Sequence, residues 1–226
     1  MSLQSLFSTG RITEIQYTNN EAKSIVIIET ISEILLNDKC GSIIKKVLLV
    51  DLRGHFDILQ LAAHLDSKSE GKLGEDKIKI LLSCLMVVRV TSYENMLVTL
   101  HSLESLIANS KDFGTIILDS MSVFYWLDVK EGYGDMYLSK IVEILNTFRT
   151  KYGLSVISTV EKIFSVKNYD QNVEPYLCQK WQDLVDLSIA LSIEGKNENR
   201  YFALKKLQSD EHFIKFTYTD NVVNFI

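Results

Sequence analysis

Blocks of apolar residues alternate with amphipathic stretches along most of this chain, which predicts strands and helices in turn. Short continuous apolar runs, two of which end in aspartate, are typical of strands buried in a parallel sheet. Stretches with apolar residues three and four positions apart predict helices that cover such a sheet. The predicted strands are Ile12–Gln16, Lys46–Asp51, Met86–Val90, Thr115–Asp119 and Leu154–Thr159. The predicted helices are Ile25–Leu36, Phe56–Leu65, Ile78–Leu82, Glu94–Ile107 and Leu138–Tyr152.

The pattern changes near residue 187 to short strand-like runs separated by polar turns. These runs are Leu187–Ile193, Tyr201–Leu207, Phe213–Tyr218 and Val222–Phe225. Parallel strands joined by crossover helices predict an α/β fold with a mostly parallel, doubly wound sheet. We expect the last part of the chain to extend this sheet with antiparallel strands.

The chain is expected to form a single domain over residues 1–226, since this length fits one large α/β domain and Pro175 is its only proline. Within that domain we expect a short N-terminal segment at residues 1–9 and an α/β core at residues 10–160. A loop and a short helix would follow at residues 161–186, and C-terminal strands at residues 187–226.

Composition narrows the classes of function. Hydrophobic residues make up 46% of the chain and charged residues 23%, as in ordinary globular proteins. The net charge of −5 gives no global basic field for nucleic acid, so any DNA contact would come from a local patch or from a partner. The three cysteines and four histidines are scattered without ligand spacing, so no metal site is expected. No apolar run reaches the ~20 residues of a membrane span.

The segment after the first predicted strand has the outline of a phosphate-binding loop, or P-loop. Such loops read G-x-x-x-x-G-K-[ST] between a strand and a helix. Lys23 and Ser24 occupy the positions of the phosphate-reaching lysine and the magnesium-binding hydroxyl, whereas Tyr17 and Ala22 replace the two glycines. Residues with a Cβ adopt the backbone of such a loop only at a cost. A strand–loop–helix with a chance Lys-Ser pair is the alternative interpretation.

Several segments resemble RecA-like eukaryotic recombinases and their paralogues. They are Gly10–Ile15, Asp51–Leu59, Leu100–Ser105, Ile117–Trp126 and Pro175–Trp181, in the order of the family. The last two are the most specific, because their aromatic and cysteine spacings recur together. The match is to a short paralogue without the amino-terminal helical domain, and beyond residue 190 only the strand-like pattern is similar.

The resemblance implies a RecA-like P-loop NTPase core and a role in homologous recombination. Such a subunit assembles with other RecA-like paralogues to support repair of DNA breaks and stalled forks. We therefore expect a nuclear protein in a hetero-oligomeric complex, with weak or indirect contact to single-stranded DNA and no membrane association.

The resemblance also implies a loss of ATP hydrolysis. In active family members the strand after the first helix ends in Asp-x-Glu, and the glutamate activates water. Here that position is Arg53, whose guanidinium cannot accept a proton. We expect Lys23, Ser24 and Asp119 to be vestigial, with Lys23 in solvent and Asp119 capping its strand rather than holding magnesium. No cofactor is expected, with weak Mg-ATP binding as the alternative.

Two other functions stay open on the sequence. One is an active or weakly active DNA-dependent ATPase with an unusual P-loop, and the other is a stand-alone module that binds single-stranded DNA. Aromatic residues also suggest a surface for partners. The candidate partner contacts are Tyr125, Trp126, Tyr176 and Trp181. Packing in the core is the common fate of such residues and is the alternative for each.

Overall fold

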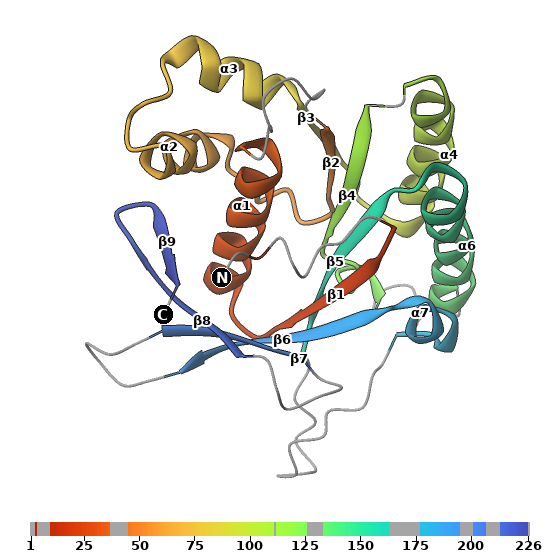
Figure 1. Cartoon of the computed structure of the whole chain (residues 1–226). Helices are drawn as coiled ribbons and strands as arrows, with labels where there is room; N and C mark the ends of the chain where they lie inside the picture. The colour runs from red at the N-terminus through yellow and green to blue at the C-terminus, as the bar shows by residue number, and fades with distance from the viewer. Residues whose placement is uncertain are drawn as a thin grey trace.

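The computed structural model describes residues 3, 10–36, 45–110, 112–125, 133–162, 177–194, 201–206 and 213–225. These residues contain one nine-stranded sheet in the order β3-β2-β4-β5-β1-β6-β7-β8-β9 (Figure 1). Its strands are β1 (Ile12–Tyr17), β2 (Lys46–Asp51), β3 (Leu85–Arg89), β4 (Phe113–Asp119), β5 (Ser155–Glu161), β6 (Leu187–Glu194), β7 (Tyr201–Lys206), β8 (Phe213–Thr219) and β9 (Val222–Phe225).

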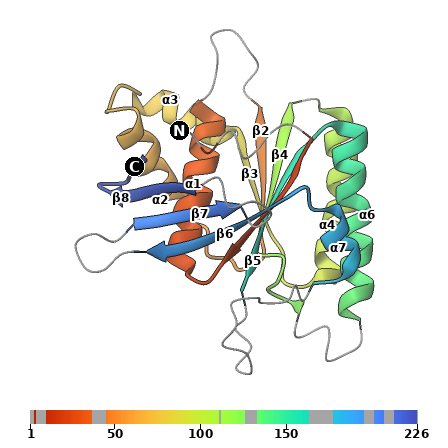
Figure 2. The same ribbon diagram turned by 60° about the horizontal axis from the view of Figure 1, so that its bottom comes forward.

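Helices cover both faces of the sheet (Figure 2). The described helices are α1 (Asn20–Leu36), α2 (Ile58–Lys68), α3 (Glu75–Ser83), α4 (Tyr93–Asn109), α6 (Gly134–Tyr152) and α7 (Gln179–Leu184). Helices α1, α2 and α3 lie on one face, and α4, α6 and α7 lie on the other. Each face therefore has its own apolar core, one centred on α1 and the other on α4 and α6.

Local sequence explains where several helices begin and end. The Ser92 hydroxyl accepts a hydrogen bond from the Asn95 N–H at 3.1 Å and so caps α4. Asp57 caps α2 in the same way by accepting from the N–H groups of Leu59 and Gln60. Helix α6 ends at Tyr152 and is capped by Gly153, whose φ of 69° is the left-handed conformation that glycine adopts without a Cβ penalty.

The predicted α/β fold with a mostly parallel sheet and antiparallel C-terminal strands is confirmed. One strand differs from the prediction, because β6 pairs with β1 in parallel, Thr13 lying opposite Leu187. The chain runs from β5 to β6 through α7, which packs against α6 on one face of the sheet. This crossover returns the chain in the direction of β1. The antiparallel pairs among the described strands are β6 with β7, β7 with β8, and β8 with β9.

The first helix also differs from the prediction, because α1 begins at Asn20 and not at Ile25. The helix therefore includes Lys23 and Ser24. None of the helices in the described part of the chain is long and apolar enough to cross a membrane.

Candidate nucleotide site

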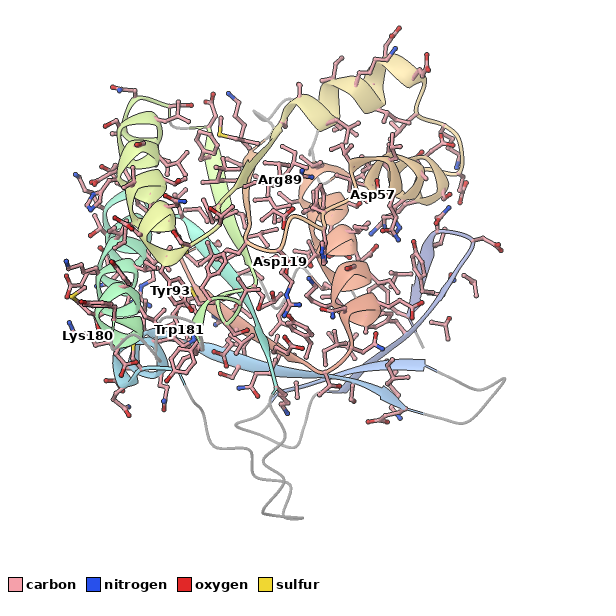
Figure 3. All side chains as sticks on the ribbon, turned by 180° about the vertical axis from the view of Figure 1, so that it is seen from behind. Asp57, Arg89, Tyr93, Asp119, Lys180 and Trp181 are labelled. Carbon is pink, nitrogen blue, oxygen red and sulfur yellow. The ribbon has the colours of Figure 1, made fainter. Side chains whose placement is uncertain are left out.

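The candidate residues meet at the carboxyl ends of the parallel strands, where open α/β sheets bind their ligands. Tyr17 ends β1, Asp119 ends β4, and Lys23 lies in the first turns of α1. Asp119 is labelled in Figure 3, near the middle of the sheet. The structure brings Lys23 and Asp119 together at this edge, in an arrangement that differs from the expected one.

The connection between β1 and α1 is a tight turn of Thr18 and Asn19. The side-chain Oδ1 of Asn19 accepts a hydrogen bond from the N–H of Ala22 at 2.9 Å, and its carbonyl accepts from the N–H of Lys23 at 3.1 Å. A phosphate-binding loop points successive N–H groups at the ligand. Here the N–H groups of Ala22 and Lys23 are used to begin the helix.

Lys23 forms a buried ion pair with Asp119. Its Nζ lies 2.7 Å from Oδ1 and 2.6 Å from Oδ2 of the aspartate, and the two residues are 2% and 6% exposed. The expectation that Lys23 lies in solvent is wrong. The early start of α1 turns this side chain inward, where a charge is stable only if it is paired.

The carboxylate of Asp119 has a second partner on β5. The hydroxyl of Thr159 donates to Oδ1 at 2.8 Å. The role expected from the sequence, hydrogen bonding to the end of its own strand, is replaced by contacts to α1 and β5. Asp119 thus joins three elements that are far apart in sequence. The peptide bond that follows it, Asp119–Ser120, is cis.

Ser24 is oriented differently from a magnesium-binding hydroxyl. Its Oγ donates to the carbonyl of Asn20 at 3.0 Å, one turn earlier in the same helix. Hydroxyls inside helices commonly make this bond. Of the three predicted residues, Lys23 and Asp119 are therefore in contact, whereas the hydroxyl of Ser24 is hydrogen-bonded within its own helix.

Tyr17 fills the space beneath Lys23. Its side chain is fully buried, and its ring centroid lies 5.5 Å from the Lys23 Nζ and 6.0 Å from the Arg53 Cζ. Burial raises the pKa of Tyr17 to about 12, although the nearby charge of Arg53 acts in the opposite direction. The phenol is therefore neutral at physiological pH, and its ring presents its face to two cations.

Arg53, which the family resemblance aligns with the catalytic glutamate, is paired with Glu161 at the end of β5. The side chain of Arg53 is 17% exposed and that of Glu161 is 41% exposed. A guanidinium cannot act as a general base. The backbone around Arg53 is fixed by Asp51, whose carboxylate accepts from the N–H groups of Arg53, Gly54, His55 and Phe56.

The aromatic candidates are distributed differently from the expectation of a partner surface. Trp181 is 1% exposed, and its Nε1 donates to Oε2 of Glu14 at 2.5 Å. Tyr125 packs in the same apolar core. These two residues are corrected from candidate partner contacts to core residues, because α7 and the segment after β4 fold onto the α6 face of the sheet. Trp126 and Tyr176 lie outside the described residues.

Sequence reasoning missed several residues of the site, among them Asn19 and Thr159. Asn19 carried a usable signal, because asparagine is a preferred residue just before a helix and Glu21 stands in the first turn. Thr159 carried none, since a threonine in a buried strand has many ordinary roles.

The fold and this edge of the sheet define the class as the RecA-like recombinase fold. The crystal structure of the RadB recombinase superposes with a TM-score of 0.74, at 19% sequence identity, over 98% of this chain and 95% of that one.

Two curated proteins are similar to the chain in sequence. DNA repair protein XRCC2 of Mus musculus is 26% identical over 214 residues, which cover 86% of this chain and 77% of that protein. DNA repair protein RAD51 homolog 3 of Dictyostelium discoideum is 22% identical over 214 residues, 88% of this chain and 56% of that protein. No protein-family model matches the chain. The two sequence similarities and the superposition on RadB confirm the resemblance to RecA-like recombinases and their paralogues.

Proposed function

We propose that this chain is a non-catalytic recombinase-paralogue subunit that assembles with other RecA-like paralogues in homologous recombination repair. The observation that carries the proposal is the similarity to two DNA repair proteins over most of the chain, together with the RecA-like fold. Breaks and stalled forks would be its sites of action, and the nucleus its compartment.

The proposal of a non-catalytic subunit is supported by the contacts at the carboxyl edge. A nucleotide would need the ammonium of Lys23 and the amides at the start of α1, and these groups have partners within the chain. Hydrolysis would also need a base near the attacking water. Arg53 occupies that position and stays protonated at any working pH.

Partners would be other RecA-like paralogues, and single-stranded DNA would be contacted weakly or through them. The net charge of −5 supports weak or indirect contact with DNA, because binding of DNA phosphates depends on clustered basic residues. A subunit that acts by binding other proteins needs only a stable scaffold for its interfaces, and the nine-stranded sheet of the described residues would supply it.

An active ATPase with an unusual loop is the second candidate. It is favoured by the meeting of Lys23 and Asp119 at the ligand-binding edge. In this case a nucleotide would have to draw Lys23 away from Asp119 and open the helix cap formed by Asn19.

The test is affinity purification of the tagged full chain from its own cells, with mass spectrometry of the proteins recovered. We expect another RecA-like paralogue at a near-equal amount, and no ATP turnover by the purified complex beyond that of the partner alone. The untagged strain is the control. A tagged chain recovered alone, with ATP turnover that Lys23→Met abolishes, would favour the ATPase.

A further inference from the structure

A continuous polar network closes the carboxyl edge of the sheet. It begins with the Lys23–Asp119–Thr159 contacts already described. The Ser120 hydroxyl donates to the carbonyl of Thr159 at 2.9 Å and lies 2.9 Å from the hydroxyl of Ser122. The Oγ of Ser122 accepts from the N–H of Glu161 at 3.0 Å, and the carboxylate of Glu161 pairs with Arg53.

This network joins α1, β4, β5 and the segment after β2. Its members come from parts of the chain that are distant in sequence, for example Lys23 and Asp119, which are 96 positions apart. Tyr17 at the end of β1 packs against both cations. The strand ends that surround a ligand in other α/β proteins are therefore tied to one another by groups of this chain.

The charges of the network balance within the chain. The ammonium of Lys23 faces the carboxylate of Asp119, and the guanidinium of Arg53 faces that of Glu161. Tyr17, whose ring lies near both cations, is neutral. Neither cation is left to attract the phosphates of a nucleotide.

We propose that the Lys23–Asp119 ion pair is an internal substitute for a bound nucleotide, which fixes the carboxyl edge in one conformation. Partner binding would then be constitutive, which means that the subunit binds its partner equally well with and without Mg-ATP. The part that concerns the partner rests on the proposed function, whereas the ion pair can be tested on the chain itself.

The cost of burying an unpaired charge predicts how each variant of the ion pair changes the stability of the protein. Removal of one partner leaves the other charge buried and uncompensated, which is strongly destabilising, whereas removal of both charges costs much less. Lys23→Met keeps most of the side-chain volume without the charge. Asp119→Asn removes the charge but keeps an oxygen that accepts from Thr159.

The experiment is a double-mutant cycle of melting temperature in the full chain, alone or in complex with its purified partner. We expect Lys23→Met and Asp119→Asn each to lower the melting temperature by about 6–20 °C. The double variant should lose much less than the sum of the two. Lys46→Met is the matched control, because the Lys46–Asp112 pair is 41% and 40% exposed and a surface pair contributes little.

Three results would overturn the proposal. They are wild-type melting of Lys23→Met, additive losses in the double variant, and a rise of several degrees with millimolar Mg-ATP that disappears in Lys23→Met. If a single variant does not fold at all, recovery of folded protein in the double variant supports the proposal, and failure of the double variant as well overturns it.

The partner measurement separates this proposal from the proposed function. Equal partner affinity with and without Mg-ATP is expected, and a dependence on the nucleotide contradicts the constitutive regulation. Absence of any RecA-like partner would remove the proposed function but leave the melting cycle of the ion pair unchanged.

Discussion

Single side chains hold distant parts of this molecule together through buried polar contacts. Glu14 on β1 is 6% exposed and accepts hydrogen bonds from Trp181 and, at 2.8 Å, from Gln16. A buried carboxylate is tolerated only when its oxygens have donors. The indole of Trp181 is therefore both an apolar anchor for α7 and a polar partner for β1.

Trp181→Phe should destabilise the protein by about 1–3 kcal/mol beyond its loss of apolar area, because Glu14 loses a donor while it stays buried. The free energy of unfolding in urea measures this loss. Tyr133→Phe is a suitable control, since Tyr133 is an exposed aromatic residue at the start of α6. Equal stabilities of Trp181→Phe and the wild type would show that the indole N–H contributes nothing.

At the scale of an element, the start of α1 depends on Asn19. Asn19→Ala removes the oxygen that accepts from the Ala22 N–H, and we expect a loss of about 1 kcal/mol in unfolding free energy. Asn19→Asp keeps the capping oxygen and should keep the stability. A thermal melt of both variants makes the comparison, and an equal loss in both would mean that the cap is not the cause.

The packing of α1 against α2 includes a buried acid. Glu29 on α1 is 1% exposed, its Oε2 lies 2.7 Å from Nε2 of His64, and Lys68 pairs with its other oxygen. Burial acts to raise the pKa of Glu29, but the hydrogen bonds from His64 and Lys68 outweigh it, so the pKa is lowered.

The sign of the pH dependence follows from this lowered pKa. A carboxyl with a lower pKa in the folded state contributes stability above its unfolded value, here 4.5, and loses it as the pH falls through the folded value. We expect the advantage of the wild type over Glu29→Gln in urea unfolding to shrink below pH 4.5. Glu70→Gln, whose side chain is 75% exposed, is the control and should show little change. A constant advantage of the wild type across this range would contradict the expectation.

At the scale of the whole molecule, the acidic balance limits contact with DNA. With a net charge of −5, the chain alone should bind oligo-dT more weakly than ~10 μM at physiological salt. Fluorescence anisotropy of a labelled oligonucleotide measures this affinity. Submicromolar binding with a steep salt dependence would favour the stand-alone module for single-stranded DNA.

The sequence alone determined the alternation of strands and helices that makes the α/β core of this protein. In the buried runs Lys46–Asp51 and Thr115–Asp119 the central residues are apolar on both faces of the strand, as a parallel sheet covered on both faces requires. The P-loop outline is likewise a local pattern, of Lys23 and Ser24 after a strand, and it predicted a candidate site at the start of the first helix.

The tertiary structure alone decided what the site residues do. Lys23 contacts Asp119, which is 96 positions away in the sequence, and Trp181 contacts Glu14, which is 167 positions away. No local sequence pattern predicts such contacts. The direction of β6 likewise depends on the crossover through α7. Hydrophobic periodicity specifies which side of an element is buried, whereas the partner of a buried charge is specified only when distant elements pack together.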